Sequence, residues 1–565
     1  MKFMLLERWR KNQNARTGQK RRPIRLCLEV LEARLLPSLT PHLLKDINPG
    51  SASPFVNYGT PAFVEVNGVA YFEASNGVSG QELWRSNGTA AGTMLVKDIK
   101  PGSNGSYPED LTNVNGTLFF SAANGVSGQL WKSNGTAAGT VLVKDFHVPK
   151  NFAYPGFLTA VGNTLFFRAD DGTHGLELWR SNGTAAGTQM VKDINPGPGN
   201  AGIDQPLNVN GTLFFGATNG VSGLELWKSN GTAAGTVLVK DINPGSADAV
   251  NGLLTNFNGT LFFTTDDVTH GQELWRSNGT AAGTQAVTDV IPTGFANVNG
   301  TLFFSGDNGV IGRELWRSNG TAAGTRLVKD INPGSASSYA GFETNVNGTL
   351  FFGADNGVSG RELWKSNGTA AGTVLVKDIH PGSADSFPGS LTNVNGTLFF
   401  SADNGVSGRE LWRSNGTAAG TVLVANIAPG STGSNPNSLT NINGMLFFVA
   451  NDGVHGFEPW VLGPVSASAP AASALMPPPL SASGPAAGLA PDAGGSGLPP
   501  AKLAKQDWSA LESGDHSRRE HLLVEDSQGM VTHVSELARR SPALLASKSP
   551  GRNIAEPEEL LGFDT

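Results

Sequence analysis

Three pairs of residues in this sequence combine a carboxylate with an imidazole three positions further on. The pairs occur in the segments "DDGTHG", "DDVTHG" and "NDGVHG" and are Asp171 with His174, Asp267 with His270, and Asp452 with His455. Imidazole and carboxylate groups both bind zinc-like ions, so each pair could supply two ligands to a metal. Turn formation explains the same residues without a metal. The pairs are therefore metal-ligand candidates.

Most other copies of this segment read "DNGVSG", as at Asp355 to Gly360. Hard cations such as Ca²⁺ prefer oxygen ligands, but this segment lacks the dense acidic spacing of an EF-hand. The sequence also shows no nucleophile beside a base and no phosphate-cradling loop. We expect no catalytic residue and no cofactor, with Ca²⁺ as the alternative.

These segments belong to a tandem repeat marked by tryptophan. Successive tryptophans are 48 residues apart, with two shorter intervals of 47 and 41 residues. They are Trp84, Trp131, Trp179, Trp227, Trp275, Trp316, Trp364, Trp412 and Trp460. The sequence therefore contains nine repeats, and the three Asp–His pairs fall in the third, fifth and ninth. Since these repeats are not neighbours, the pairs are expected to form separate sites rather than one shared site.

Each repeat contains four short apolar segments separated by glycine-rich turns. In the eighth repeat these segments are "LTNVN", "TLFFSAD", "ELWRS" and "TVLV", which we name strands a to d. Asn395-Gly396 between the first two predicts a two-residue type I′ hairpin. Four strands in about 48 residues match a propeller blade, so an all-β propeller of about nine blades is predicted.

The two ends of the array complement each other. A lone fourth strand, "HLLKDINPG" from His42, precedes the first repeat, whereas the last repeat stops after "FEPWVLG" at Gly463. If the N-terminal strand completes the last blade, the ring closes and leaves no open sheet edge. Nine blades exceed the usual four to eight, so an open array is the alternative.

The repeated phrase "ELWKSNGTAAGT" is expected to be architecture. The tryptophans are predicted to fill the space between neighbouring blades, because an aromatic ring supplies a large apolar area. Glu362 and Lys377 are expected to be paired or solvated charges at strand ends. The connections from d to a vary most, as in "NPGSASSYAGFET" against "HPGSADSFPGSLT", and binding faces of repeat proteins are often the variable ones.

The phrase resembles the ELWxxDGT repeat family of bacterial proteins, with Asn in place of the Asp of the family name. The resemblance extends from Leu43 to about Gly463. It implies propeller-like repeats, an extracellular location and no settled activity. A weaker likeness connects "GRELW" to the tryptophan-docking motif of quinoprotein propellers, but Asp355 to Gly360 is one residue too long for that motif.

The ends of the chain differ from the ring in composition. Residues 1–38 contain ten Lys or Arg and three Glu, and "LEVLEARLLPS" resembles the N-terminal export segment of planctomycete proteins. Residues 39–463 are the predicted propeller, residues 464–500 an Ala, Pro, Ser and Gly linker, and residues 501–565 a charged, mostly disordered tail. The single cysteine, Cys27, lies in the N-terminal segment.

These observations restrict the function. The chain carries a net charge of −7, because the acidic excess of the remainder is larger than the basic excess of the N-terminal segment. Nucleic-acid binding requires a basic face, so we expect no nucleic-acid partner. No apolar stretch reaches the length of a membrane span. We expect an exported, monomeric ring that acts as a non-catalytic binding or adhesion module toward a carbohydrate or surface protein. The alternatives are a propeller enzyme, lyase or quinoprotein-like, and a purely structural surface scaffold.

Overall fold

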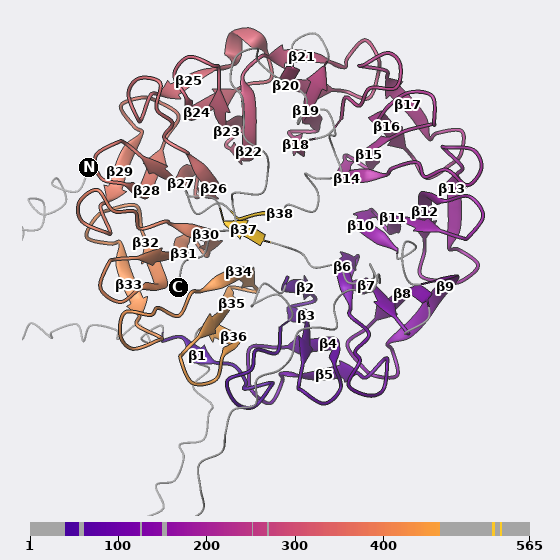
Figure 1. Ribbon diagram of the computed structural model, residues 1–565, viewed down its shortest axis with the longest axis horizontal. Helices are drawn as coiled ribbons and strands as arrows, with labels where there is room; N and C mark the ends of the chain where they lie inside the picture. The colour runs from indigo at the N-terminus through magenta and orange to yellow at the C-terminus, as the bar shows by residue number, and fades with distance from the viewer. Residues whose placement is uncertain are drawn as a thin grey trace, which may run out of the picture. The chain divides into compact units, whose positions relative to one another are not determined.

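The computed structural model describes residues 40–55, 62–124, 127–149, 155–250, 252–267, 271–463, 523–525 and 531–533. Nine four-stranded antiparallel sheets surround a common axis, as Figure 1 shows. In each sheet strand a is innermost and strand d outermost. The predicted nine-bladed propeller is therefore confirmed.

The blades follow the chain in order. Blades 1 to 3 contain β2 (Val64–Val66), β3 (Val69–Ser75), β4 (Gln81–Ser86), β5 (Met94–Lys97), β6 (Glu109–Val114), β7 (Thr117–Ala123), β8 (Ser127–Ser133), β9 (Val141–Pro149), β10 (Gly156–Val161), β11 (Thr164–Asp170), β12 (Leu176–Ser181) and β13 (Gln189–Lys192). Blades 4 to 6 contain β14 (Asp204–Val209), β15 (Thr212–Ala217), β16 (Glu225–Ser229), β17 (Val237–Lys240), β18 (Leu254–Phe257), β19 (Thr260–Asp267), β20 (Gly271–Ser277), β21 (Gln285–Thr288), β22 (Ile291–Val298), β23 (Thr301–Asp307), β24 (Arg313–Ser318) and β25 (Arg326–Lys329). Blades 7 to 9 contain β26 (Gly341–Val346), β27 (Thr349–Asp355), β28 (Arg361–Ser366), β29 (Val374–Lys377), β30 (Gly389–Val394), β31 (Thr397–Asp403), β32 (Arg409–Ser414), β33 (Val422–Ala425), β34 (Asn437–Ile442), β35 (Met445–Asn451), β36 (Phe457–Leu462) and β1 (His42–Leu43).

The last blade is completed by the first strand of the chain. β1 pairs antiparallel with β36, with His42 opposite Val461 and Leu43 opposite Trp460. The Leu44 N–H then donates to the Pro459 carbonyl at 2.9 Å. The predicted closure of the ring is confirmed, because strand d of blade 9 comes from the other end of the sequence.

Turn chemistry explains where the strands of each blade end. Asn395 and Gly396 have φ values of 51° and 82°, which the predicted type I′ hairpin requires. In the c to d turn, the Asn367 carboxamide oxygen accepts hydrogen bonds from the Thr369 N–H and hydroxyl. The Thr369 hydroxyl accepts from the Gly372 N–H, and a Cβ at Gly372 would lie 1.9 Å from the Asn367 oxygen. The phrase "SNGTAAGT" therefore builds a self-contained turn, which explains its repetition.

The tryptophans of strand c lie between adjacent blades. Trp412 is 5% exposed and packs in one cluster with Phe351 and Val376 of blade 7 and with Phe400 of its own blade. Eight of the nine tryptophans are buried in this way, and Trp131 is partly buried.

In six of the nine blade-to-blade contacts, a lysine at the end of strand d of the preceding blade lies over the strand c tryptophan and donates a hydrogen bond to the following c to d turn, an arrangement that we call the lysine clasp. The Lys377 Nζ lies 5.5 Å from the centre of the Trp412 ring and donates to the Thr421 carbonyl at 2.8 Å. The lysines that make both contacts are Lys45, Lys97, Lys192, Lys240, Lys329 and Lys377. The lysine clasp therefore joins neighbouring blades, including blades 9 and 1 through Lys45. Thr288 and Ala425 occupy this position where the lysine is replaced.

The C-terminal part of the chain, Ala471–Thr565, forms a second unit. It is described only in β37 (Leu523–Glu525) and β38 (Val531–His533), which pair antiparallel. The predicted export segment, the linker and most of the predicted tail lie outside the described residues. Among the described residues, no helix is long and apolar enough to cross a membrane.

Candidate functional site: the variable-loop face

One face of the ring carries the b to c and d to a connections, which we call the variable-loop face. The glutamate of the repeated phrase anchors its d to a loops. Glu362 is 0% exposed, and its carboxylate accepts hydrogen bonds from the N–H groups of Ile379 at 2.8 Å and His380 at 3.3 Å. It also accepts from the N–H and hydroxyl of Ser386, at 3.1 and 2.7 Å. The expectation of a paired or solvated Glu362 was wrong, because the carboxylate is buried and its partners are backbone N–H groups and a serine hydroxyl of the following loop.

The same anchor recurs wherever the d to a loop is long. The equivalent buried glutamates are Glu82, Glu177, Glu225, Glu314, Glu410 and Glu458, and each accepts from at least two loop N–H groups. Burial raises the pKa of Glu362 to about 7, against the lowering effect of the loop donors. Each anchored loop is thus held by a buried group that water does not reach.

The two blades without this anchor have different loops. In blade 2 the glutamate is missing, and Gln129 donates to the Asp145 carboxylate at 2.7 Å beside the extended β9. In blade 5 the connection from β21 to β22 is short, and Glu273 instead accepts from the Trp275 indole N–H at 2.9 Å. The glutamate that recurs in strand c of the repeats therefore accompanies the long d to a loops, and its hydrogen bonds to them identify it as a positioning residue for these loops.

Three of the anchored loops hold an aromatic residue in the left-handed region of the backbone. Tyr107, Tyr339 and Phe387 have φ values of 49°, 48° and 45° and stand two positions before the inner strands β6, β26 and β30 begin. Tyr107 is 49% exposed and Tyr339 is 40% exposed. A bulky residue at positive φ costs about 1–3 kcal/mol, and such strain concentrates at functional sites. Tyr339 and Phe387 lie on neighbouring loops that begin adjacent blades.

Ionisable residues meet at the inner ends of blades 1 to 3 on this face. Burial, and to a smaller extent the Glu109 carboxylate, raises the pKa of Glu73 to about 7. The Asp110 carboxylate accepts from the Phe157 N–H at 2.7 Å, and the Arg168 guanidinium lies 4.3 Å from the Phe157 ring. Burial raises the pKa of Asp110, although the Phe157 N–H and Arg168 favour its charged form. Glu109 and Asp110 directly precede the "LTNVN" segment of blade 2, whereas Glu73 and Arg168 lie on the second strands β3 and β11 of their blades.

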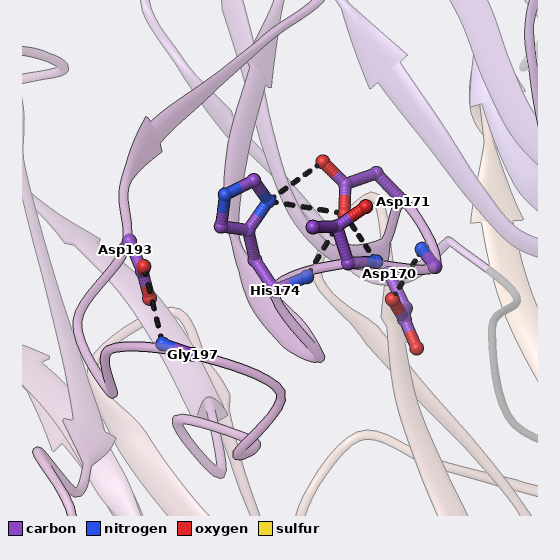
Figure 2. A network of polar contacts seen from close by, with 7 residues as sticks. Asp170, Asp171, His174, Asp193 and Gly197 are labelled. Atoms are coloured by element: carbon purple, nitrogen blue, oxygen red, sulfur yellow. Dashed lines mark hydrogen bonds and ion pairs between the residues drawn. The ribbon is translucent and has the colours of Figure 1, made fainter.

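Two of the predicted Asp–His pairs are described, and in both the histidine bonds its own aspartate. The ring Nδ1 of His174 lies 2.9 Å from an Asp171 carboxylate oxygen, as Figure 2 shows, and that of His455 lies 2.7 Å from Asp452. The hydrogen bond to Asp171 raises the pKa of His174. The nearby Asp193 accepts instead from the Gly197 N–H at 3.4 Å.

The third pair is only partly described, since Asp267 ends β19 and His270 lies outside the described residues. Within the part of the chain that the structure describes, no three His, Cys, Asp or Glu side chains are grouped to hold a metal ion. Each described pair therefore serves as a turn with an internal ion pair, and the structure does not bring two pairs together.

The sequence reasoning missed the aromatic residues and the ionisable group. Tyr339 and Phe387 occupy equivalent places in "SSYAG" and "DSFPG", so alignment of the repeats could have found them. Glu73, which stands where blade 2 has Ser121, could have been found in the same way. The positive φ of Tyr339 and Phe387 and the burial of Glu73 could not be predicted from the residue types.

Comparison with known proteins gives a likeness of fold alone. No family model matches the sequence, and no curated protein is significantly similar to it. A solved structure of puromycin hydrolase is 13% identical over 61% of this chain and 59% of that one, with a TM-score of 0.34. One of two prolyl endopeptidases is 11% identical over 63% of this chain and 55% of its own, with a TM-score of 0.37. Saccharomyces cerevisiae Sqt1 is 10% identical over 74% of this chain and 99% of its own, with a TM-score of 0.33.

This chain therefore spans less than two thirds of the length of the puromycin hydrolase and the prolyl endopeptidase. At these identities and TM-scores the likeness carries no argument about activity.

Proposed function

We propose that this protein is an exported or cell-surface binding module whose variable-loop face contacts a carbohydrate or a surface protein. The observation that carries this proposal is the set of aromatic residues, Tyr107, Tyr339 and Phe387, held at positive φ on glutamate-anchored loops. Rigid aromatic side chains supply large contact areas at low entropic cost, and they dominate binding energy at interfaces. The resemblance to the ELWxxDGT repeats and the basic N-terminal segment support export.

A glycan array probed with the full chain tests this proposal. Replacing Tyr339 or Phe387 with serine should weaken the binding of the glycan that the array identifies at least about tenfold, since aromatic residues at interfaces contribute about 1–2 kcal/mol or more to the free energy of binding. The matched control is Val374→Ala, a partly exposed residue on the outer strand β29. Undiminished binding by both serine variants would refute the assignment to this face. The absence of any glycan signal would favour a protein partner or the structural scaffold.

The ionisable group at blades 1 and 2 supports a second candidate, a propeller enzyme. Two neighbouring carboxyl groups, one of them protonated near neutral pH, can act as a general acid and a base. Glu73 and Glu109 would take these roles. Incubation of the bound glycan with the full chain tests this candidate: turnover that Glu73→Gln abolishes supports an enzyme, and intact glycan supports the non-catalytic module.

A further inference from the structure

The opposite face of the ring carries the a to b turns, where asparagine side chains link neighbouring blades close to the axis. Asn393 accepts a hydrogen bond from the Gly396 N–H at 2.9 Å, and its amide donates to the Asn345 carbonyl of the preceding blade at 3.1 Å. Asn395 donates to the Gly444 carbonyl of the following blade at 3.4 Å. The asparagines that donate to the carbonyl of a preceding blade as Asn393 does are Asn113, Asn208, Asn256, Asn345 and Asn441. We call this arrangement the asparagine ring.

The asparagine ring lacks its side-chain donor in blade 3, where Ala160 takes the place of Asn393, and again where blade 9 meets blade 1. Glu65 takes the place of Asn393 in blade 1, and it accepts from the Gly68 N–H as the asparagine would. A carboxylate has no N–H group, however, so Glu65 cannot donate to the Asn441 carbonyl. Among the described residues, Asn443, the counterpart of Asn395, forms no hydrogen bond with Gly68; a Cβ on that glycine would lie 3.6 Å from its amide nitrogen.

A cavity of about 730 Å³ opens where blade 9 meets blade 1. It is lined by Glu65 and Asn67 of blade 1, by Asn395 of blade 8, and by Asn441 and Asn443 of blade 9, with two glycines. Glu65, Asn67, Asn441 and Asn443 are exposed to solvent. The lining therefore presents one carboxylate and several amides, and it contains no apolar side chain.

We propose that this cavity binds a neutral, hydroxyl-rich ligand of sugar size. Each hydroxyl group is both a donor and an acceptor, which matches amides that offer both functions beside a carboxylate that only accepts. A hydrogen bond to the charged Glu65 is the strongest one available in the cavity. Only one carboxylate lines the cavity, so it lacks the acidic ligand set of a Ca²⁺ site. The cavity lies on the face opposite the variable loops, so this second site does not depend on the proposed function.

Saturation-transfer NMR on the full chain tests this proposal with glucose, galactose and N-acetylglucosamine as probes. At least one sugar should bind to the natural chain. Glu65→Asn introduces the asparagine found at this position in seven of the other eight blades, so it should fold, and it should weaken that binding at least about tenfold. Glu65→Gln, which keeps the side-chain length, serves as a second variant if the first is produced poorly.

Val374→Ala, on the outer strand β29 and outside both proposed sites, is the control, and it should leave the sugar affinity unchanged. Binding that survives Glu65→Asn, or that Val374→Ala abolishes, would overturn the proposal. So would the failure of all three sugars to bind. Calorimetric titration with Ca²⁺ alone is the last arm: Ca²⁺ binding that Glu65→Asn removes would assign the cavity to a cation instead.

Discussion

Replacement of Lys377 with methionine tests whether the lysine clasp holds neighbouring blades together. The Lys377 Nζ donates to the Thr421 carbonyl at 2.8 Å and lies 5.5 Å from the Trp412 ring centre. Methionine keeps the unbranched side chain and its packing but removes the donor and the charge. The variant therefore isolates the polar part of the clasp.

The two contacts set the expected loss of stability. A hydrogen bond from a charged group contributes about 1.5–3 kcal/mol, and a cation over an aromatic ring at a partly exposed site contributes about 0.5–1 kcal/mol. Lys377 is half-buried, so solvent weakens both terms. We expect Lys377→Met to lower the free energy of unfolding by about 2 kcal/mol.

Urea unfolding of the full chain, followed by tryptophan fluorescence, measures this change. The midpoint should fall while the slope m stays constant, because the folded and unfolded surfaces are nearly unaltered. Lys100→Met is the matched control, since no hydrogen bond from the Lys100 side chain is found among the described residues, and it should change stability by less than about 0.5 kcal/mol. A loss at Lys377 no larger than that of the control would refute the clasp.

Three further predictions concern the same scaffold. Thr288→Lys should create the missing clasp between blades 5 and 6 and raise the free energy of unfolding by about 1 kcal/mol in the same urea assay; no gain would contradict it. The pKa of Glu362 rises from 4.5 to about 7 on folding. The contribution of its protonated form to the free energy of unfolding is therefore complete below about pH 4.5 and is lost as pH rises through 7. The stability of Glu362→Gln relative to the natural chain should therefore increase between pH 5 and 8 in thermal melts, and a decrease would show that the loop donors outweigh burial. Removal of residues 1–49 should leave the edge of β36 unpaired and produce oligomers detectable by light scattering, whereas a monodisperse monomer would contradict closure by β1.

The fold could be predicted because the repeats carry the same residue types at nearly the same spacing. The tryptophan interval gave the number of blades, and Asn395-Gly396 gave the position of the first hairpin in its blade. The lone strand at His42 matched a last repeat that ends without its fourth strand. Each of these signals depends on residue type and spacing alone.

The role of Glu362 could not be predicted in the same way. Three of its four hydrogen bonds come from backbone N–H groups of the following loop, which any residue except proline supplies, and the fourth comes from the Ser386 hydroxyl, 24 positions away in the sequence. The positive φ of Tyr339 could not be predicted either, because tyrosine has no preference for the left-handed region of the backbone. Glu65 differs from the asparagine of most other repeats, and this difference can be read from the sequence. Its effect on the asparagine ring depends on the contact between the first and last blades, which only the closed ring creates.

The closure of the ring also dictates the order of its assembly. Ile47, just beyond β1, donates its N–H to Glu458, a residue 411 positions away in the sequence. Because β1 is synthesised before the last blade, it must wait for that blade before it finds its partner. Contacts between neighbouring repeats have low contact order and form early, whereas this one closes the longest loop in the domain. The loop after β1, which Glu458 anchors through Ile47 and Asn48, therefore forms only once the ninth repeat has been synthesised, and that repeat completes the propeller.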